Sequence, residues 1–299
     1  MLEAERRIRP YLAPTPLIES PALGPGALLK LETLQPTGSF KVRGALAALT
    51  RIGPGERVVT ASAGNHALGV AWAAATLGVE ATVVVAETAS PAKLAALERL
   101  PVELVRHGAA YEEAERHALA LVAEGRRYVS AYNDPDVIAG GGTLGLELPA
   151  GPLTIVCPVG GGGLCAGVAL WASTVPGARV LGVEAAVSQA VSAALTAGRV
   201  VPIQVGPTLA DGLAGNLELG SVTVELIRAH VAEIVAVTEA ELEEAIRFLA
   251  REHGLVAEGA GAAAAAALLA GRVEGGGRAV ALVTGRNIEP KTLARVLAP

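Results

Sequence analysis

One lysine of this chain stands in a setting typical of an amine nucleophile. Lys41 lies in the stretch TGSFKVRG, next to the aromatic Phe40 and between Gly38 and Gly44. A lysine attacks a carbonyl group only as the neutral amine, so it must be partly desolvated. Phe40 could pack on a flat ring, and the glycines let the backbone turn closely around it. The alternative is an ordinary surface lysine at the start of a helix.

Two further stretches could bring polar groups to the same ligand. The stretch ASAGNHALGVA places Ser62, Asn65 and His66 on a turn between an apolar strand and a helix. Backbone amides of such a turn could bind a carboxylate, and a side-chain amide could bind a ring oxygen. VTGRN ends an apolar strand with Thr284, a hydroxyl at the carboxyl edge where ligands of open α/β sheets bind.

A glycine loop indicates a phosphate site. The stretch CPVGGGGLCAGVALW has four consecutive glycines after a strand and before a helix: Gly160, Gly161, Gly162 and Gly163. Free N–H groups at a helix N-terminus bind anions, and glycine lets a phosphate approach closely. With Ala166 the loop also satisfies the dinucleotide fingerprint, and Glu184 ends the next strand where a ribose-binding acid would lie. An NAD-dependent oxidoreductase and a purely structural tight turn are therefore alternatives.

Short strands and alanine-rich helices must position these residues. Runs such as ATVVVA and RAVALV are apolar at consecutive positions, which is typical of parallel strands covered on both faces. Ser90 before Pro91 indicates one helix start, and a capping box of Thr238 and Glu241 indicates another. The alternation predicts an α/β protein with doubly wound parallel sheets.

The composition excludes several classes of protein. Of the 299 residues, 52% are hydrophobic and 18% charged, which is typical of a compact globular chain. The net charge of −5 argues against a nucleic-acid groove, and no uncharged apolar run approaches the ~20 residues of a membrane helix. The start MLEAERRIRP has no apolar signal-peptide core, and Cys157 and Cys165 lack zinc-site spacing. We expect a cytoplasmic protein with no nucleic-acid or membrane partner.

The motifs together resemble a known family. LKLETLQPTGSFKVRGA, ASAGNHALGVA, PVGGGGLCAGVA, AEGAGAAAAA and VTGRN appear in the order and spacing of the serine/threonine dehydratases. These are fold-type II pyridoxal-phosphate enzymes, related to serine racemase and the tryptophan synthase β-subunit. The resemblance covers nearly the whole chain and implies a tryptophan synthase β-like homodimer with pyridoxal 5'-phosphate as cofactor. It also implies a small domain, 57–133, inserted into a large one built from 1–56 and 134–299.

The resemblance assigns a role to each candidate residue. Lys41 would carry the Schiff base, Phe40 would pack on the pyridine ring and Asn65 would bind its phenolic oxygen. The glycine loop would hold the phosphate, and Thr284 would face the pyridine nitrogen. The substrate would be surrounded at its carboxylate and side chain by Ser62, Ala63, Gly64, Asn65, His66 and Tyr132.

The implied reaction is loss of water from L-threonine, L-serine or a similar β-hydroxy amino acid, giving a 2-oxo acid and ammonia. Lys41 would remove the Cα proton as general base. A serine or aspartate racemase is the nearest alternative, but the second acid/base of serine racemases falls at Ala63, which has no proton to give. Arg286 is either a surface residue or a group that recognises an acidic substrate, as in a hydroxyaspartate dehydratase. A pyridoxal-phosphate binder without activity is a third alternative.

One site of the relatives is incomplete here. Their divalent cation is bound by a glutamate, a carbonyl four residues on and an acid two residues beyond that. Glu184 and Ser188 match the first two positions, but Ala190 occupies the third. Because a hard cation needs several oxygen ligands, we expect no metal site.

Overall fold

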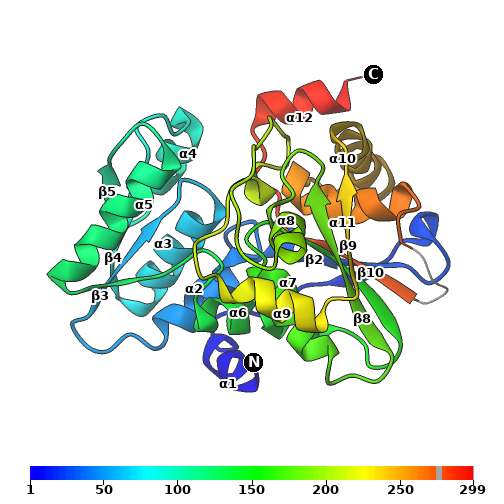
Figure 1. The fold of residues 1–299 in the computed structure, drawn as a ribbon, viewed down its shortest axis with the longest axis horizontal. Coiled ribbons are helices and arrows are strands. Elements are labelled where there is room, and N and C mark those ends of the chain that lie inside the picture. Colours follow the sequence, from blue (N-terminus) through cyan, green and yellow to red (C-terminus); the bar gives the residue numbers. More distant parts are fainter. Residues whose placement is uncertain (274–277, 299) are drawn as a thin grey trace. The chain divides into compact units, whose positions relative to one another are not determined.

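The computed structural model describes residues 1–273 and 278–298 (Figure 1). Packing divides the chain into two compact units. Unit 1 consists of Met1–Ala13 and Lys41–Gly141, and unit 2 consists of Pro14–Phe40 and Gly142–Pro299. The chain therefore passes between the units at three places, one of them between Phe40 and Lys41.

Unit 1 is built on a four-stranded parallel sheet in the order β5-β4-β3-β6. Its strands are β3 (Arg57–Ala61), β4 (Glu80–Val85), β5 (Glu103–Arg106) and β6 (Arg126–Tyr128). Its helices are α1 (Leu2–Ile8), α2 (Lys41–Leu49), α3 (Asn65–Leu77), α4 (Pro91–Leu97), α5 (Tyr111–Ala120) and α6 (Pro135–Gly142), with a 3₁₀ turn η3 (Leu121–Glu124).

Both faces of this sheet are buried, which explains its consecutive apolar residues. Val58 packs with residues of α1, α2 and α3, whereas its neighbour Val59 packs with α5 on the other face. Successive strand side chains point to opposite faces, so a strand covered on both sides is apolar throughout.

Unit 2 is built on a six-stranded sheet in the order β1-β2-β10-β7-β8-β9. The strands are β1 (Leu17–Glu19), β2 (Leu28–Leu31), β7 (Leu153–Pro158), β8 (Ala178–Ala185), β9 (Glu233–Val237) and β10 (Arg278–Val283). Its helices are α7 (Gly163–Ala172), α8 (Ala190–Ala197), α9 (Val222–His230), α10 (Glu239–His253), α11 (Gly259–Leu269) and α12 (Pro290–Leu297). The short turns are η1 (Pro21–Leu23), η2 (Glu32–Leu34), η4 (Thr143–Glu147) and η5 (Asp211–Leu213). Only the edge strand β1 pairs antiparallel among these described strands.

Helix α11 is the central helix of unit 2. Every residue from Ala262 to Ala267 is fully buried, and the helix belongs to the same core as strands β7, β8 and β10. A Cβ at Gly261 would lie 2.2 Å from the Gly285 carbonyl oxygen, so the backbones touch directly. Only methyl groups or hydrogens fit where a helix packs this closely.

The predicted α/β fold with two parallel-sheet units is confirmed. The capping box is present: Thr238 N donates to Glu241 Oε2 at 2.7 Å, and Glu241 N donates to Thr238 Oγ1. Packing places α1, α2 and α6 with the smaller sheet, although the predicted ranges 1–56 and 134–299 assign them to the large domain. Those ranges, which also include 274–277 and Pro299 outside the described residues, stay a prediction.

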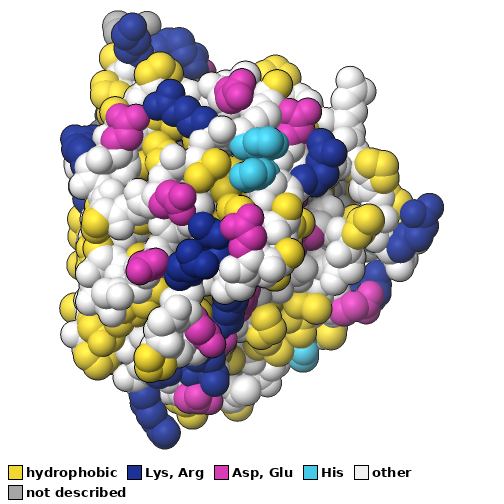
Figure 2. Space-filling view, turned by 90° about the vertical axis from the view of Figure 1, so that its left-hand side faces the viewer, with side chains coloured by type: hydrophobic (Ala, Val, Ile, Leu, Met, Phe, Trp, Pro, Cys, Tyr) yellow, Lys and Arg dark blue, Asp and Glu magenta, His cyan; other side chains and the backbone are white. Residues whose placement is uncertain are grey.

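Among the helices that the structure describes, none combines the length and the apolar character needed to cross a bilayer. On the face drawn in Figure 2, basic side chains lie among acidic ones and do not gather in one area. Ion pairs of unit 1 such as Arg106–Glu98, at 2.9 Å, and Arg126–Glu124, at 2.7 Å, likewise bring opposite charges together. This face therefore offers no continuous basic surface.

Candidate active site

Lys41 is the first residue of α2 and is half-buried. Its Nζ donates a hydrogen bond to the Ala131 carbonyl oxygen at 2.8 Å. A Cβ at Gly69 would lie 3.1 Å from the Lys41 carbonyl carbon, so α3 approaches the lysine backbone closely. The lysine is thus held between α3 and the segment that follows β6.

The predicted carboxylate-binding turn follows the carboxyl end of β3. Ser62 N donates to the Val84 carbonyl oxygen at 3.2 Å, and Gly64 N donates to Ser62 Oγ at 3.2 Å. Gly64 occupies the N-cap of α3, no side chain caps that helix, and Asn65 is its first residue. Ser62, Ala63, Gly64 and Asn65 are all half-buried. Backbone amides at such a helix start are suited to an anion.

His66 lies inside unit 1, with 2% of its surface exposed. Its Nε2 lies 3.1 Å from the Val129 carbonyl oxygen, and its Nδ1 is buried without a hydrogen-bond partner. Burial, and then the charge of Lys41, lower the pKa of His66 from 6.5 to about 3, although the bond to Val129 acts in the opposite direction. The imidazole is therefore neutral near pH 7 and donates no proton from a charged form.

Tyr132 lies in the turn after β6. Ser130 Oγ accepts hydrogen bonds from Tyr132 N at 3.4 Å and Asn133 N at 3.0 Å, which fixes this turn. Because β3 and β6 are parallel neighbours, their carboxyl ends meet at one edge of the sheet. Unit 1 therefore brings together Lys41, the Ser62–His66 turn and Tyr132 at that edge.

Unit 2 holds the remaining candidates at the carboxyl ends of β7 and β10, which are also parallel neighbours. The glycine loop follows β7, and Gly162, with a φ of +86°, occupies the N-cap of α7. A Cβ at Gly162 would lie 2.7 Å from Ile227 Cδ1, and a Cβ at Gly160 would lie 3.0 Å from the Gly212 carbonyl oxygen. No side chain caps α7. Ile227 and Gly212 therefore pack directly against the loop, and the first turn of α7 is suited to an anion.

Thr284 follows β10 and is 3% exposed, with its Oγ1 3.4 Å from the Ala260 carbonyl oxygen. It belongs to a contact that the sequence did not predict, between 37–40 and 284–287, which we call the 37–40 clamp. Phe40 N donates to the Thr284 carbonyl oxygen at 3.0 Å, Arg286 N to Gly38 O at 2.9 Å, and Asn287 Nδ2 to Thr37 O at 2.9 Å. The clamp fixes the residue that directly precedes Lys41.

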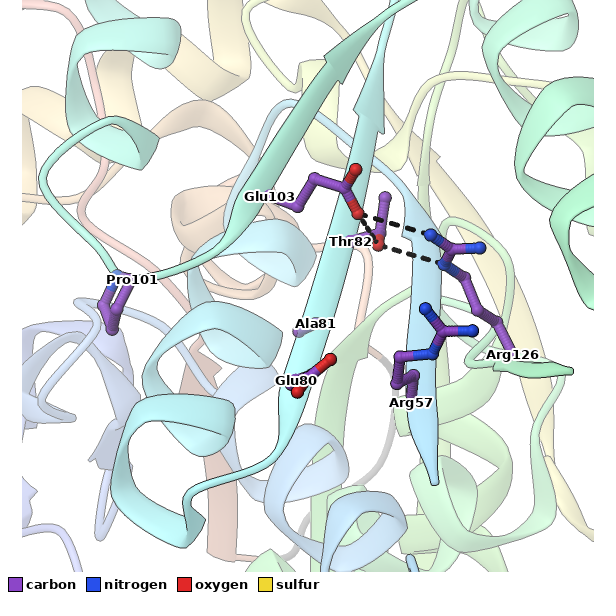
Figure 3. Close-up of a pocket in the computed structure, with 7 residues that line it drawn as sticks. All are labelled: Arg57, Glu80, Ala81, Thr82, Pro101, Glu103 and Arg126. Atoms are coloured by element: carbon purple, nitrogen blue, oxygen red, sulfur yellow. Dashed lines mark hydrogen bonds and ion pairs between the residues drawn. The ribbon is translucent and has the colours of Figure 1, made fainter. Parts of the chain in front are cut away.

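Three other features lie outside this group. The side chain of Arg286 is exposed, and both cysteines are buried and free, with burial raising the pKa of the Cys157 thiol. A hollow of about 180 Å³ in unit 1 is lined by Arg57, Glu80, Ala81, Thr82, Pro101, Glu103 and Arg126 (Figure 3). Four of these residues begin the parallel strands β3, β4, β5 and β6, so the hollow lies at the sheet edge opposite the Ser62 turn.

Two of the charged residues that line this hollow pair with each other. Arg126 donates to Thr82 Oγ1 at 3.3 Å and pairs with Glu103 at 3.5 Å (Figure 3). The Thr82 hydroxyl, and then the guanidinium groups of Arg126 and Arg57, hold the pKa of Glu103 below its ordinary value. These contacts describe a paired surface and not a catalytic centre.

The family model of the pyridoxal-phosphate dependent enzymes matches residues 8–285. The chain belongs to this family. An L-threonine ammonia-lyase of Thermotoga maritima is 40% identical, with 99% of this chain and 76% of that protein covered. The structure of a T.th. threonine deaminase superposes with a TM-score of 0.88 at 38% identity, covering 96% of this chain and 97% of that one. Maize serine racemase gives a TM-score of 0.90 at 29% identity, covering 98% and 94%.

Membership confirms the predicted resemblance and the cofactor, pyridoxal phosphate. The residues present fit that group: an amine at Lys41, an anion-binding turn without side chains at Gly160–Gly163, and a buried hydroxyl at Thr284. The oxidoreductase alternative is wrong, because the chain matches the pyridoxal-phosphate dependent enzymes over residues 8–285. Glu184, the candidate for a ribose-binding acid, is buried and accepts hydrogen bonds from Val191 N and Ser192 N. The chain is therefore a pyridoxal-phosphate-dependent enzyme.

Proposed function

We propose that this enzyme is an ammonia-lyase that removes water from L-threonine, L-serine or a similar β-hydroxy amino acid, releasing a 2-oxo acid and ammonia. The observation that carries the proposal is the position of Lys41 beside an uncapped helix start at the same sheet edge. The threonine ammonia-lyase and threonine deaminase named above support it, since their identity of 38–40% extends over nearly the whole chain.

We propose a role towards the cofactor, pyridoxal phosphate, for each of these candidates. Lys41 holds it covalently at rest, Phe40 packs on its ring and Asn65 binds the ring oxygen. The amides of the glycine loop bind its phosphate, because the first turn of α7 has no side-chain cap. Thr284 faces the ring nitrogen with a neutral hydroxyl. When bound, pyridoxal phosphate supplies an electron sink for the charge left at the substrate Cα.

The residues of unit 1 bind and deprotonate the substrate in this proposal. The amides of the Ser62–His66 turn bind the carboxylate, and Tyr132 lies against the side chain. Lys41 Nζ then takes the proton from Cα. Lys41 Nζ donates to the Ala131 carbonyl oxygen, which holds the amine at the sheet edge where the Ser62–His66 turn lies.

The same residues favour elimination over racemisation. A racemase must return a proton to the opposite face of Cα, and Ala63 has none to give. His66, on the same turn, is neutral because its pKa is about 3. Racemisation stays the second candidate because serine racemase has the same fold at a TM-score of 0.90. Hydroxyaspartate is a further candidate substrate, because the Arg286 guanidinium could bind its second carboxylate. The backbone of Arg286 is held by a hydrogen bond from its N to Gly38 O.

A substrate panel tests the proposal. Holoenzyme is assayed for ammonia and 2-oxo acid from L-threonine, L-serine and 3-hydroxyaspartate, and for enantiomer exchange by chiral chromatography. We expect ammonia from at least one of these amino acids and no exchange above background. Lys41→Ala should abolish both turnover and the cofactor label that borohydride fixes to the protein, whereas Lys291→Ala, at an exposed lysine of α12, should change neither. A fully active Lys41→Ala variant would refute the assignment.

We also propose a homodimeric, cytoplasmic protein that acts on small molecules and not on nucleic acid or membranes. The support is the family resemblance and the mixed charge of the surface in Figure 2. Light scattering after gel filtration gives the mass in solution, and a monomer would contradict the dimer.

A further inference from the structure

A buried carboxylate joins the end of β8 to the start of α8. Glu184 is 1% exposed, and its Oε1 accepts a hydrogen bond from Val191 N at 2.8 Å. Its Oε2 accepts one from Ser192 N at 3.2 Å and a short one from Ser192 Oγ. Both carboxylate oxygens are thus bound by the first turn of the helix. We call these contacts the α8 cap.

The position of Glu184 is that of the first cation ligand in the resembled family, so the donor set can be compared with a cation's needs. The third position is Ala190, which has no side-chain oxygen. At the second position the ligand would be the Ser188 carbonyl oxygen, and the Ser188 side chain is bound elsewhere, because its Oγ accepts a hydrogen bond from Gly215 N at 3.2 Å. Within residues 1–273 and 278–298, no three His, Cys, Asp or Glu side chains gather as metal ligands do. Divalent cations such as Mg²⁺ and Ca²⁺ require about six or more oxygens, so the residues present do not fit one.

We propose that the α8 cap does in this protein what a bound divalent cation does in its relatives, so that stability and cofactor binding are independent of divalent cations. The amides and the hydroxyl that surround Glu184 supply the positive partial charge that a cation would supply. Ser192 is the residue that makes the difference, because its hydroxyl adds a third donor where a helix start alone offers amides.

The α8 cap lies next to residues that support the glycine loop. Val183, the neighbour of Glu184, accepts the hydrogen bond of Val159 N at 2.7 Å, and Val159 directly precedes the loop. Ser188 binds Gly215, and the nearby Gly212 carbonyl oxygen lies against Gly160. Loss of the α8 cap would therefore displace the glycine loop through these contacts. Ser192 acts on cofactor binding in this indirect way and is a positioning residue.

Binding and melting measurements test the proposal without using the proposed lyase activity. Holoenzyme dialysed against EDTA is melted alone and with Mg²⁺, Mn²⁺ or Ca²⁺, and each metal salt is titrated by calorimetry. We expect the same Tm in every condition and no heat of binding. A cation at a hundredfold excess over its Kd would instead raise the Tm by roughly 5 °C. Such a rise, or a saturable heat of binding, would overturn the proposal.

Variants of Ser192 test the role of its hydroxyl. Ser192→Ala should lower the Tm by a few degrees and weaken pyridoxal phosphate binding about tenfold, at the low end of the ~10–100-fold effects of supporting residues. Ser192→Thr keeps the hydroxyl and should restore both values. Ser173→Ala removes an exposed hydroxyl bonded to Leu170 O and serves as the control, with no change in cofactor affinity. Equal cofactor affinity in Ser192→Ala and Ser192→Thr would refute the positioning role.

Discussion

Replacement of Gly38 by alanine should destabilise the 37–40 clamp by a calculable amount. Gly38 has a φ of +76°, which costs a residue with a Cβ about 1–2 kcal/mol. The new Cβ would also lie 2.5 Å from Asn287 Oδ1, so the Asn287 amide must move and lose its bond to Thr37 O. Such a hydrogen bond contributes about 0.5–1.5 kcal/mol net. The expected loss in the free energy of unfolding is therefore about 1.5–3.5 kcal/mol.

A matched glycine separates the two contributions. Gly220 has nearly the same φ, +74°, but its Cβ would meet nothing within 4 Å. Gly220→Ala should therefore cost only the backbone part, about 1–2 kcal/mol. Urea unfolding of both variants measures the difference. In the double variant Gly38→Ala/Asn287→Ala the second substitution should cost less than Asn287→Ala costs alone, because the first has already broken the bond to Thr37 O.

Activity provides a second measurement on the same variants. Since the clamp fixes Phe40, which precedes Lys41, Gly38→Ala should lower kcat about tenfold or more, as small misplacements of reacting groups do. Gly220→Ala should leave kcat unchanged. Equal losses of stability in Gly38→Ala and Gly220→Ala would refute the clash with Asn287. So would a double variant whose loss equals the sum of the losses in Gly38→Ala and Asn287→Ala.

Three further outcomes are expected. The pKa of His66 is about 3 in the folded state and near 6.5 in the unfolded state. Below pH 6.5 the unfolded state binds a proton that the folded state does not, so the free energy of unfolding declines as the pH falls from 6.5 towards 3. In urea titrations at several pH values, His66→Gln should flatten this decline. Ala63→Ser supplies a proton donor on the substrate turn and should raise serine racemisation, measured by chiral chromatography, about tenfold or more, where an ideally positioned acid contributes ~10²–10⁴-fold; no increase would remove Ala63 as the determinant. Cys157 and Cys165 are buried, so neither thiol should react with a disulfide reagent until urea unfolds the chain, and a fast reaction of the native enzyme would contradict their burial.

The sequence predicted the parts of the site that depend on local chain order. Glycine between a strand and a helix, or a polar turn after an apolar strand, is a short-range pattern with a direct physical meaning. The glycine loop and the Ser62–His66 turn are therefore found where they were expected, after β7 and β3. The individual roles of Phe40, Asn65 and Tyr132 towards a cofactor and substrate stay predictions.

Contacts between distant segments could not be predicted. Arg7 Nη2 binds Asp136 Oδ1 at 3.0 Å across 129 positions, and Arg51 Nε binds the same carboxylate at 2.8 Å. These ion pairs, with Ala4 and Ile8 in the core beside Leu46, hold α1 in unit 1, but no periodicity in the sequence indicates them. The partner of Asn287 and the carbonyl at His66 were missed for the same reason, since a lone asparagine or histidine does not reveal which backbone group it meets.

The buried alanine helix α11 has a consequence for comparing such sequences. Its Ala262–Ala267 run has the least varied composition of any helix here, and repetitive stretches of that kind are commonly discounted when chains are aligned. Yet each of its methyl groups is fully enclosed, and Gly261 touches the backbone of Gly285. Any larger side chain would have to displace the core of the larger sheet. Uniform composition here marks strict steric selection, so this stretch should be given full weight when the enzyme's relatives are compared.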